Sequence, residues 1–366
     1  MKRKTSIAVL SILLVALIVI LLVSFTGNTV KSESIKIGVF TPLTGDAAIY
    51  GQAMKDGLDL AAQEINEQGL LNMQIELIYE DTHLDSKEAV TAMNKFINID
   101  KVDFVIAAEG SGATSAAVPL ADQTRTLTII GIASSPTLRE AGDYVFRVIP
   151  SDAYQAVEIA NLAKELDSGS AGILYVNDAF GIGFKDAFTE SFSEKVYSET
   201  FEASDSDFRS QLTKLKAKDP EVLVVVARKE FPNILKQIKE YGIESQVIGS
   251  VELNDESLVE AAGSAAEGVL VPFYAEQTDY MNYNTKFQQR YSKEPSLFSD
   301  YGFDALTVLA KAVENADSIE SEKVKNELYR TVYYGATGVV QFDNYGEVTG
   351  KEFEIYQIRN GKFVLY

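Results

Sequence analysis

Hydroxyl-bearing residues gather at two places in this 366-residue sequence, each directly after an apolar run. The stretch GSGATSAA (110–117) carries Ser111 and Thr114 at the start of a helical pattern, and Ser134 and Ser135 follow the run LTIIGIA. Backbone amides at a helix start, together with hydroxyl groups, bind an anion such as a carboxylate without a full positive charge nearby. We therefore predict that these four residues hold a ligand carboxylate, with plain helix capping as the alternative for any one of them.

Other kinds of chemistry find little support in the residue types. The chain has no cysteine and one histidine, His83, which stands in the segment YEDTHLDSK beside three carboxylates. A single histidine in such a loop favours a solvated segment over a metal site. Neither a GxSxG nucleophile elbow nor a GxxxxGK[ST] phosphate loop occurs. We predict that the protein is not an enzyme and uses no cofactor and no metal.

The net charge limits the possible partners of the protein, and the N-terminal segment limits its possible location. The 33 Lys and Arg against 53 Asp and Glu give a formal charge of -20, which argues against nucleic acid as a partner. Three cationic residues at positions 2–4 precede Ile7–Phe25, an uncharged apolar run that is long enough to span a membrane. We predict an extracytoplasmic protein tethered to the membrane by this run, with a cleaved signal peptide as the alternative.

The elements that would position the hydroxyl groups follow an alternating pattern. From Glu33 onward, strand-like runs alternate with helical patterns, and a second such series begins after VFRVIPSDAYQ. The predicted fold is α/β, with two doubly wound parallel-sheet lobes joined by a three-stranded hinge. After an anchor and linker at 1–32, lobe 1 is predicted to hold 33–149 plus 273–338, and lobe 2 to hold 150–272 plus 339–366. Ligands of open parallel sheets bind beyond the carboxyl ends of the strands, so the cleft between the lobes is the predicted site. The glycine pair in FGIG (180–183) is expected to allow a close backbone approach at the lobe interface.

Several segments, taken in order, resemble one known family. They are IKIGVFTPLTGDAAIYGQAMKDGLDLAAQEIN, YEDTHLDSKEAVTAMNKFI, VDFVIAAEGSGATSAA, IIGIASSPTL, YVFRVIPSDAYQ, NDAFGIGFKDAF and the closing FDNYGEVTGKEFEIYQIRNGKF. The chain after the apolar run resembles the leucine/isoleucine/valine-binding proteins, the solute receptors of ABC transporters. The resemblance implies a type I periplasmic-binding-protein fold that closes like a hinge around one small polar ligand, and ABC permease subunits as partners.

The resemblance also implies roles for particular residues. In the first lobe, the carboxylate-binding hydroxyls of the family fall on Ser111 and Ser135, and backbone contributions are expected from Ala133 and Ser134. Tyr50 matches an aromatic residue that lines the family's pocket, and Phe180 stands where members often carry Tyr.

The second lobe departs from the family pattern. Where the family places an acid and a Tyr for the ligand ammonium, this sequence has Val251 with Glu252 beside it, and Ala227 with Arg228. Glu252 is thus an acid shifted by one residue or an acid lost. Arg228 either recognises a second carboxylate or is a solvated surface arginine. Glu109 either contacts the ligand ammonium or caps a helix.

Two functions remain open from the sequence. The first is a solute-binding protein that captures a small carboxylate-bearing ligand, an amino acid with a branched or other side chain, for an ABC importer. The alternative is a ligand-sensing ectodomain that signals to a partner membrane protein.

Overall fold

The structure, a computed structural model, describes residues 34–275, 278–351 and 353–366. The chain divides into two units, Met1–Ser34 and Ile35–Tyr366, and the second contains the folded body. The predicted anchor at Ile7–Phe25 lies outside the described residues and stays a prediction. Among the residues that are described, no helix is both long and apolar enough to cross a membrane.

Strands and helices alternate along the described chain, as the sequence pattern predicts. The strands are β1 (Ser34–Thr41), β2 (Gln74–Asp81), β3 (Phe104–Ala107), β4 (Thr128–Ile130), β5 (Val145–Arg147), β6 (Ser170–Val176), β7 (Lys195–Phe201), β8 (Val222–Val226), β9 (Gln246–Gly249), β10 (Leu270–Tyr274), β11 (Tyr333–Gly335), β12 (Gly338–Val340), β13 (Phe353–Arg359) and β14 (Lys362–Leu365). The α-helices are α2 (Ala48–Gln68), α3 (Ser86–Lys95), α4 (Ser111–Thr124), α5 (Asp152–Glu165), α6 (Ala179–Ser191), α7 (Arg209–Lys216), α8 (Phe231–Glu240), α9 (Glu256–Ala262), α10 (Tyr283–Tyr291), α11 (Ser299–Ala316) and α12 (Ser321–Leu328). Shorter helical turns are η1 (Phe96–Asp100), η2 (Pro136–Glu140), η3 (Val251–Leu253) and η4 (Gly263–Ala265).

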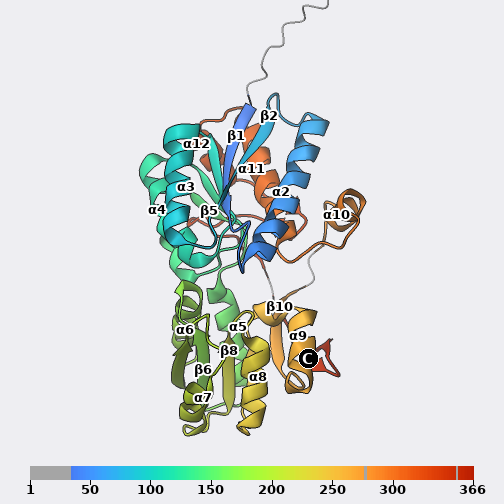
Figure 1. The fold of residues 1–366 in the computed structure, drawn as a ribbon. Coiled ribbons are helices and arrows are strands. Elements are labelled where there is room, and N and C mark those ends of the chain that lie inside the picture. The colour runs from blue at the N-terminus through green and yellow to red at the C-terminus, as the bar shows by residue number, and fades with distance from the viewer. Residues whose placement is uncertain (1–33, 276–277, 352) are drawn as a thin grey trace, which may run out of the picture. The chain divides into compact units, whose positions relative to one another are not determined.

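The first lobe is built on a five-stranded sheet in the order β2-β1-β3-β4-β5. Strand β3 pairs in parallel with both β1 and β4, and β4 pairs in parallel with β5. All four residues of β3 are buried, and alternate residues enter different cores: Phe104 and Ile106 join the core that contains α2 and α11, while Val105 and Ala107 join the core under α3 and α4. Figure 1 shows these helix pairs on the two sides of the sheet. Burial on both faces explains why the strand is a continuous apolar run.

Helices α2 and α11 pack closely, although they are far apart in the sequence. A Cβ atom on Gly57 of α2 would lie 1.8 Å from the carbonyl oxygen of Ser299, so a side chain at this position is excluded. The absence of a Cβ lets the two backbones approach. Residues 299–316 therefore complete the first lobe even though the second lobe lies between them and α2 in the sequence.

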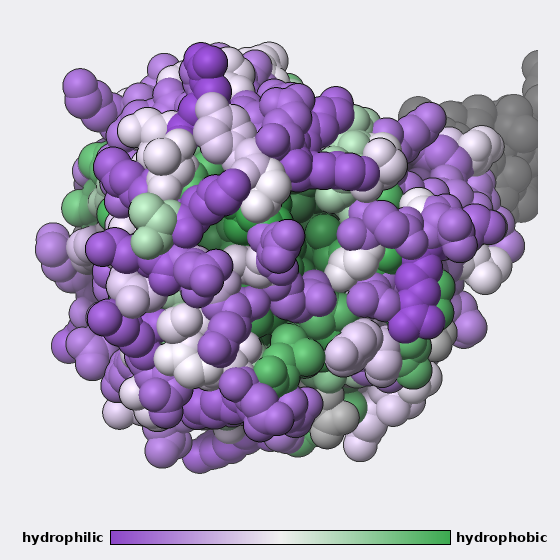
Figure 2. Space-filling view, turned by 90° about the horizontal axis from the view of Figure 1, so that it is seen from below, coloured by the Kyte–Doolittle hydropathy of each residue, from purple (hydrophilic) through white to green (hydrophobic). Residues whose placement is uncertain are grey.

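The second lobe is built on a seven-stranded sheet in the order β14-β13-β10-β9-β8-β6-β7. The pairings from β7 to β10 are parallel, and the closing strands β13 and β14 add to β10 in antiparallel fashion. The closing pair therefore lies at one edge of a sheet that earlier strands have already formed, as the sequence order predicts. Seen from the side of this lobe, the surface is mostly hydrophilic, and hydrophobic residues gather near the middle of the face (Figure 2).

The chain passes between the lobes three times: after β5, after β10 and between β12 and β13. The predicted fold class, with two α/β lobes and three connections, is confirmed. The lobe boundaries are less simple near the C-terminus. Val340 and Val348 stand in the segment predicted for lobe 2, but both side chains pack in the core of the first lobe with Phe146. The third connection therefore leaves the first lobe after Val348.

Both sheets share one strand order. Read from β7, the second sheet runs β7-β6-β8-β9-β10, which repeats the order β2-β1-β3-β4-β5 of the first. In each sheet the order reverses between the first strand and the third strand of its series. Ligands of open α/β sheets bind in the crevice outside the carboxyl ends of the strands at such a point. The loops after β1, β3 and β4, and those after β6, β8 and β9, are therefore the places to examine for a site.

Candidate functional site

The two hydroxyl-rich loops of the first lobe lie side by side. Ser111 is the first residue of α4, and its Oγ accepts a hydrogen bond of 3.2 Å from the backbone N–H of Ser135. Both side chains are buried. The parallel pairing of β3 with β4 explains the contact, because it brings the carboxyl ends of the two strands to the same edge of the sheet. The structure thus brings together the two residues that the sequence pairs on a ligand carboxylate.

Thr114 and Glu109 are occupied within the first lobe. The hydroxyl of Thr114 donates to the carbonyl of Glu109 at 3.1 Å, and Thr114 is fully buried. The carboxylate of Glu109 accepts from the hydroxyl of Thr82 and from the N–H of Gly110 at 2.9 Å. Burial raises the pKa of Glu109 to about 7, and these two donors act against the rise. Both side chains are thus engaged near the start of α4, although neither caps the helix, because no side chain accepts a hydrogen bond as its N-cap.

The backbone of Ala133, Ser134 and Ser135 is held from two sides. The guanidinium Nη1 of Arg147 donates to the carbonyls of Ala133 at 3.2 Å and Ser135 at 2.9 Å. The carbonyl of Ser134 accepts from the N–H of Asp152 at 2.8 Å. The carbonyls of the loop are therefore already engaged, and the loop is fixed to the first connection between the lobes.

Helix α6 of the second lobe lies directly against this loop. The hydroxyl of Ser135 donates to the carbonyl of Ala179 at 2.9 Å. A Cβ atom on Gly183 would lie 2.8 Å from the Oγ of Ser135 and 2.9 Å from the Cδ of Pro136. Glycine at 183 thus permits the close approach at the lobe interface that the FGIG segment predicts. Because the Ser135 hydroxyl has a single hydrogen, it donates either to Ala179 across the lobes or to a ligand carboxylate.

Arg228 and Phe180 form one unit in the second lobe. The Arg228 guanidinium lies 4.5 Å from the centroid of the buried Phe180 ring, and its Nη1 donates to Oδ2 of Asp178 at 2.8 Å. Burial lowers the pKa of Arg228, but the charges of Asp178, Glu252 and Glu230 outweigh it and leave the pKa raised. The Arg228 side chain is 32% exposed, and carboxylates of the chain itself already compensate its charge.

Four residues of the second lobe, Asp152, Gln155, Ser250 and Glu252, carry buried polar atoms that lack hydrogen-bond partners among the described residues. We call these four residues the wall of the candidate site. The atoms without a hydrogen-bond partner of standard geometry are both carboxylate oxygens of Asp152, both polar atoms of the Gln155 amide, the Oγ of Ser250 and Oε2 of Glu252. Asp152, Gln155 and Ser250 are essentially inaccessible, and Glu252 is half-buried. Buried polar groups in folded proteins are nearly always satisfied by protein, water or ligand, so these four residues are candidates for contact with a bound molecule.

The two acids in this wall influence each other. Burial raises the pKa of Asp152 to about 8, with the charge of Glu252 as the next cause, while Ser134 and two arginines act against the rise. Burial likewise raises the pKa of Glu252. Without a cation between them, both carboxylates cannot be ionised at low cost. The arrangement therefore favours a bound positive charge.

Tyr50 faces this wall from the first lobe. Its ring lies 5.8 Å from that of Phe298, and its hydroxyl is half-buried near the start of α2. Burial is the first cause of its raised pKa and the charge of Glu252 is the second, whereas the charge of Arg228 acts against the rise, so the phenol lies close to these second-lobe residues. Asp46, in the loop before α2, also forms an ion pair with Lys229 at 2.7 Å across the lobes. Most predicted site residues, namely Tyr50, Ser111, Ser134, Ser135, Phe180, Arg228 and Glu252, thus belong to one region.

Sequence reasoning missed Asp152, Gln155 and Arg147. Asp152 and Gln155 follow Pro150 and Ser151 in the pattern PSDAYQ, where an ordinary helix start explains them equally well. Arg147 ends β5 within an apolar strand pattern, and a charged residue in such a strand was the available signal. His83, in contrast, is exposed, its Nδ1 lies 2.6 Å from Glu88, and the described residues contain no group of three metal-ligating side chains.

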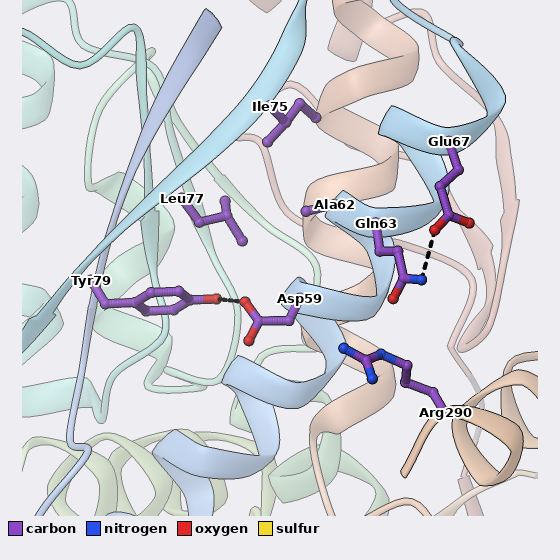
Figure 3. Close-up of a pocket in the computed structure, with 8 residues that line it drawn as sticks. All are labelled: Asp59, Ala62, Gln63, Glu67, Ile75, Leu77, Tyr79 and Arg290. Carbon is purple, nitrogen blue, oxygen red and sulfur yellow. Dashed lines mark hydrogen bonds between the residues drawn. The ribbon is translucent and has the colours of Figure 1, made fainter.

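A separate cavity lies away from these loops. It has a volume of about 600 Å³ and is lined by Asp59, Ala62, Gln63, Glu67, Ile75, Leu77, Tyr79 and Arg290. Figure 3 shows Tyr79 pointing toward Asp59, to which its hydroxyl donates at 2.7 Å, with Arg290 approaching from α10. Burial and the Asp59 charge raise the pKa of Tyr79. No predicted site residue lines this cavity, and its polar groups are largely paired with one another, so we place the candidate site at the strand ends instead.

Comparison with known proteins identifies the family of this chain. A family model described as "Periplasmic binding protein" matches residues 34–362. The leucine-, isoleucine-, valine-, threonine- and alanine-binding protein of Pseudomonas aeruginosa is 27% identical over 344 residues, which cover 91% of this chain and 92% of that protein.

Two solved structures are similar to this chain over most of its length. The chain is similar to a leucine-binding protein from Thermotoga maritima, with a TM-score of 0.82, 25% identity, and coverage of 91% of this chain and 97% of that one. It is also similar to the branched-chain amino acid transporter substrate-binding protein of Streptococcus pneumoniae, solved in complex with isoleucine, with a TM-score of 0.78, 28% identity, and coverage of 90% and 98%. The predicted resemblance to leucine/isoleucine/valine-binding proteins is confirmed by these relatives.

Proposed function

This chain belongs to the periplasmic binding protein family, and from that premise we propose that it captures an amino acid outside the cytoplasm and delivers it to an ABC permease. The carboxylate of the ligand is held by Ser111, Ser135 and the free backbone amide between them in space, that of Ser134. The ammonium is held by Asp152 and Glu252. Tyr50 and Phe180 line the part of the site that takes the side chain.

The observation that carries this proposal is the unpartnered carboxylate of Asp152. Both of its oxygens are buried without a standard hydrogen bond, and Glu252 adds a second carboxylate to the same wall. An uncompensated buried charge is costly, whereas a charge-assisted hydrogen bond to an ammonium is among the stronger polar interactions. A zwitterion supplies a cation to this wall and an anion to the hydroxyl groups of the first lobe.

The same charges argue against a dicarboxylate as the ligand. Arg228 is the cation that could bind a second carboxylate, but its guanidinium is already paired with Asp178 and lies close to Glu230 and Glu252. A second ligand carboxylate would have to displace Asp178 and approach three acids. We therefore place a neutral side chain beside the Phe180–Arg228 unit.

Contacts between the lobes support capture by closure. The hydrogen bonds from Ser135 to Ala179 and from Asp152 to Ser134, and the ion pair between Asp46 and Lys229, all join the two lobes at the edge of the site. A ligand that bridges the lobes adds to these contacts only in the closed form, and so shifts the population toward it.

The test is a binding measurement on the purified protein. Isothermal titration with leucine, isoleucine, valine, threonine and alanine should show binding of at least one, and glutarate should bind far more weakly. The double substitution S111A/S135A should weaken binding by about 2–3 kcal/mol, or about 30–150-fold, because two hydrogen bonds to a charged group are lost. Ser115→Ala, on the same helix but lining a different cavity with Val118 and Pro119, should leave the affinity within about twofold. Undiminished binding by the double variant would refute the carboxylate assignment.

Delivery to a permease and location rest on the family. The relatives named above are binding proteins, and the family implies an extracytoplasmic solute receptor with no catalytic step. The alternative of a sensing ectodomain finds no support in the comparisons. Loss of amino acid uptake on deletion of the protein, restored by the wild type but not by S111A/S135A, would support delivery; unchanged uptake would contradict it.

A further inference from the structure

Arg147 is a fully buried arginine at the end of β5 that the proposed function does not use. Its side chain is 1% exposed. Nη1 donates to the carbonyls of Ala133 and Ser135, and Nη2 is paired with the buried carboxylate of Glu347. A planar guanidinium can hold several acceptors in fixed directions, which an ammonium cannot do. Arg147 therefore fixes two carbonyls of the loop that carries Ser134 and Ser135.

The direction of these carbonyls determines where the loop amides point. In a trans peptide the C=O and the following N–H lie on opposite sides of the chain. When Arg147 holds the carbonyl of Ala133, the N–H of Ser134 must point away from the guanidinium. This amide donates to no residue that the structure describes, so it is available to a ligand anion, while the next amide, of Ser135, donates to Ser111.

Arg147 also lies where segments that lead into the second lobe leave the first. It stands at the start of the first connection, five residues before Asp152, and its charge acts against the raised pKa of that acid. Glu347 stands just before the third connection, and the two residues also form a β-bridge. The same charge acts on Tyr274, the last residue of β10 before the second connection. One side chain thus joins the hinge to the hydroxyl-rich loop.

We propose that Arg147, anchored by Glu347, is a positioning residue for ligand binding: it orients the Ala133–Ser135 loop so that the Ser134 amide and the Ser135 hydroxyl meet the ligand carboxylate. This inference rests on the proposed function for its role in affinity. Arg147 does not itself bind the ligand. Its contribution to affinity comes from the prior orientation of the loop, which a ligand would otherwise have to impose.

The first arm of the test needs no ligand. Amide hydrogen exchange at Ser134 and Ser135 is measured by NMR in the full-length ligand-free protein, for the wild type, Arg147→Lys and Glu347→Gln. Lysine keeps the charge but cannot hold both carbonyls, so we expect exchange about tenfold faster or more in Arg147→Lys. Arg139→Lys is the matched control, because Arg139 pairs with Asp343 in the same two segments but is half-exposed; it should stay within about twofold.

The second arm measures affinity for L-leucine and L-isoleucine in a double-mutant cycle. We expect Arg147→Lys to weaken binding by about tenfold, and its effect to be smaller in a Ser135→Ala background, because that background already lacks one of the two contacts that Arg147 positions. When Arg147→Lys is combined with Glu252→Gln, which changes a residue that holds the ligand ammonium, the two fold-changes in affinity should multiply. If Arg147 only stabilised the fold, the fold-change in affinity caused by Arg147→Lys would multiply with that of Ser135→Ala as well as with that of Glu252→Gln.

The outcomes separate the two proposals. Exchange at Ser134 and Ser135 that stays within twofold of the wild type in both Arg147→Lys and Glu347→Gln would overturn the positioning role, as would effects that multiply with Ser135→Ala. If the wild type binds neither amino acid, the proposed ligand fails, and the exchange arm still decides whether Arg147 orients the loop. If Arg147→Lys does not fold, Glu347→Gln, which is isosteric, supplies both measurements with an expected change of about threefold or more.

Discussion

Replacement of Asp152 by Asn should weaken ligand binding and stabilise the ligand-free protein at the same time. Asp152 is buried without a standard hydrogen-bond partner, and its carboxylate lies near that of Glu252. In the proposed site these acids hold the ligand ammonium. A residue selected for binding rather than for stability should show opposite effects on the two properties, whereas an ordinary core residue should lower both.

The magnitude follows from the pKa of Asp152, which burial and Glu252 raise from 3.8 to about 8. Because the folded-state pKa is raised, the stability of the free protein is fully present below about pH 4 and declines as the pH rises toward 8. At 1.36 kcal/mol for each pH unit, the loss at pH 7 is at most about 4 kcal/mol. Asn cannot ionise, but its buried amide also lacks partners, so we expect a net gain of about 1–3 kcal/mol for the variant at pH 7–8.

Ligand affinity should depend on the same ionisation of Asp152, but it should rise with pH where the stability of the free protein falls. An ammonium binds the ionised pair, so the wild type should release about 0.9 proton per ligand at pH 7. Its affinity should rise about ninefold from pH 6 to 7 and about fivefold from pH 7 to 8. Asp152→Asn should lose most of this pH dependence. At pH 8 it should bind about 10–100-fold more weakly, because a hydrogen bond between charged groups becomes one to a neutral amide.

The assay is isothermal titration with L-leucine in phosphate and in Tris, whose different ionisation enthalpies report the protons released, together with thermal unfolding of the free proteins. Asp186→Asn, a change of an exposed acid on α6, is the control and should alter neither property. Wild-type affinity that is constant from pH 6 to 8, with no proton release, would refute the reasoning. So would an Asp152→Asn protein that is less stable but binds normally.

Three further outcomes are expected. Gly57→Ala should lower the free energy of unfolding by about 1–3 kcal/mol, measured by denaturant titration, because its Cβ would meet the Ser299 carbonyl at 1.8 Å; Gly112→Ala, with open space around the Cβ, should not lower it. Lys229→Ala should change the affinity by less than about threefold in 0.15 M salt, and by less still at higher salt, because its ion pair with Asp46 is exposed; a larger loss would mean that this pair controls closure. Arg228→Lys should alter the preference among neutral amino acids, measured by competition, without creating affinity for glutarate, because Asp178 still compensates the charge; tight glutarate binding would contradict the assignment of the side-chain region.

The sequence by itself determined the architecture and half of the site. Strand and helix patterns repeat over short distances, and the parallel order of the strands follows from them, so the loops after β3 and β4 had to meet at one edge. The contact between Ser111 and Ser135 is a consequence of that order. Whether Glu252 is a shifted acid or a lost one stays open, but it lies in the short turn Val251–Leu253 after β9, where no strand alternation fixes the side of the chain.

Only the tertiary structure decided which polar groups have partners. Asp152 and Glu252 are a hundred residues apart, and Arg147 and Glu347 two hundred. No local pattern therefore shows that the carboxylate oxygens of Asp152 lack standard hydrogen bonds among the described residues, whereas Arg147 is paired with Glu347. The same holds for Arg228, whose charge is compensated by Asp178, and for Thr114, whose hydroxyl is used within its own helix start. Burial and charge compensation depend on residues that the fold brings together from distant segments, whereas the periodicity of the chain records only which side of its own helix or strand a residue occupies.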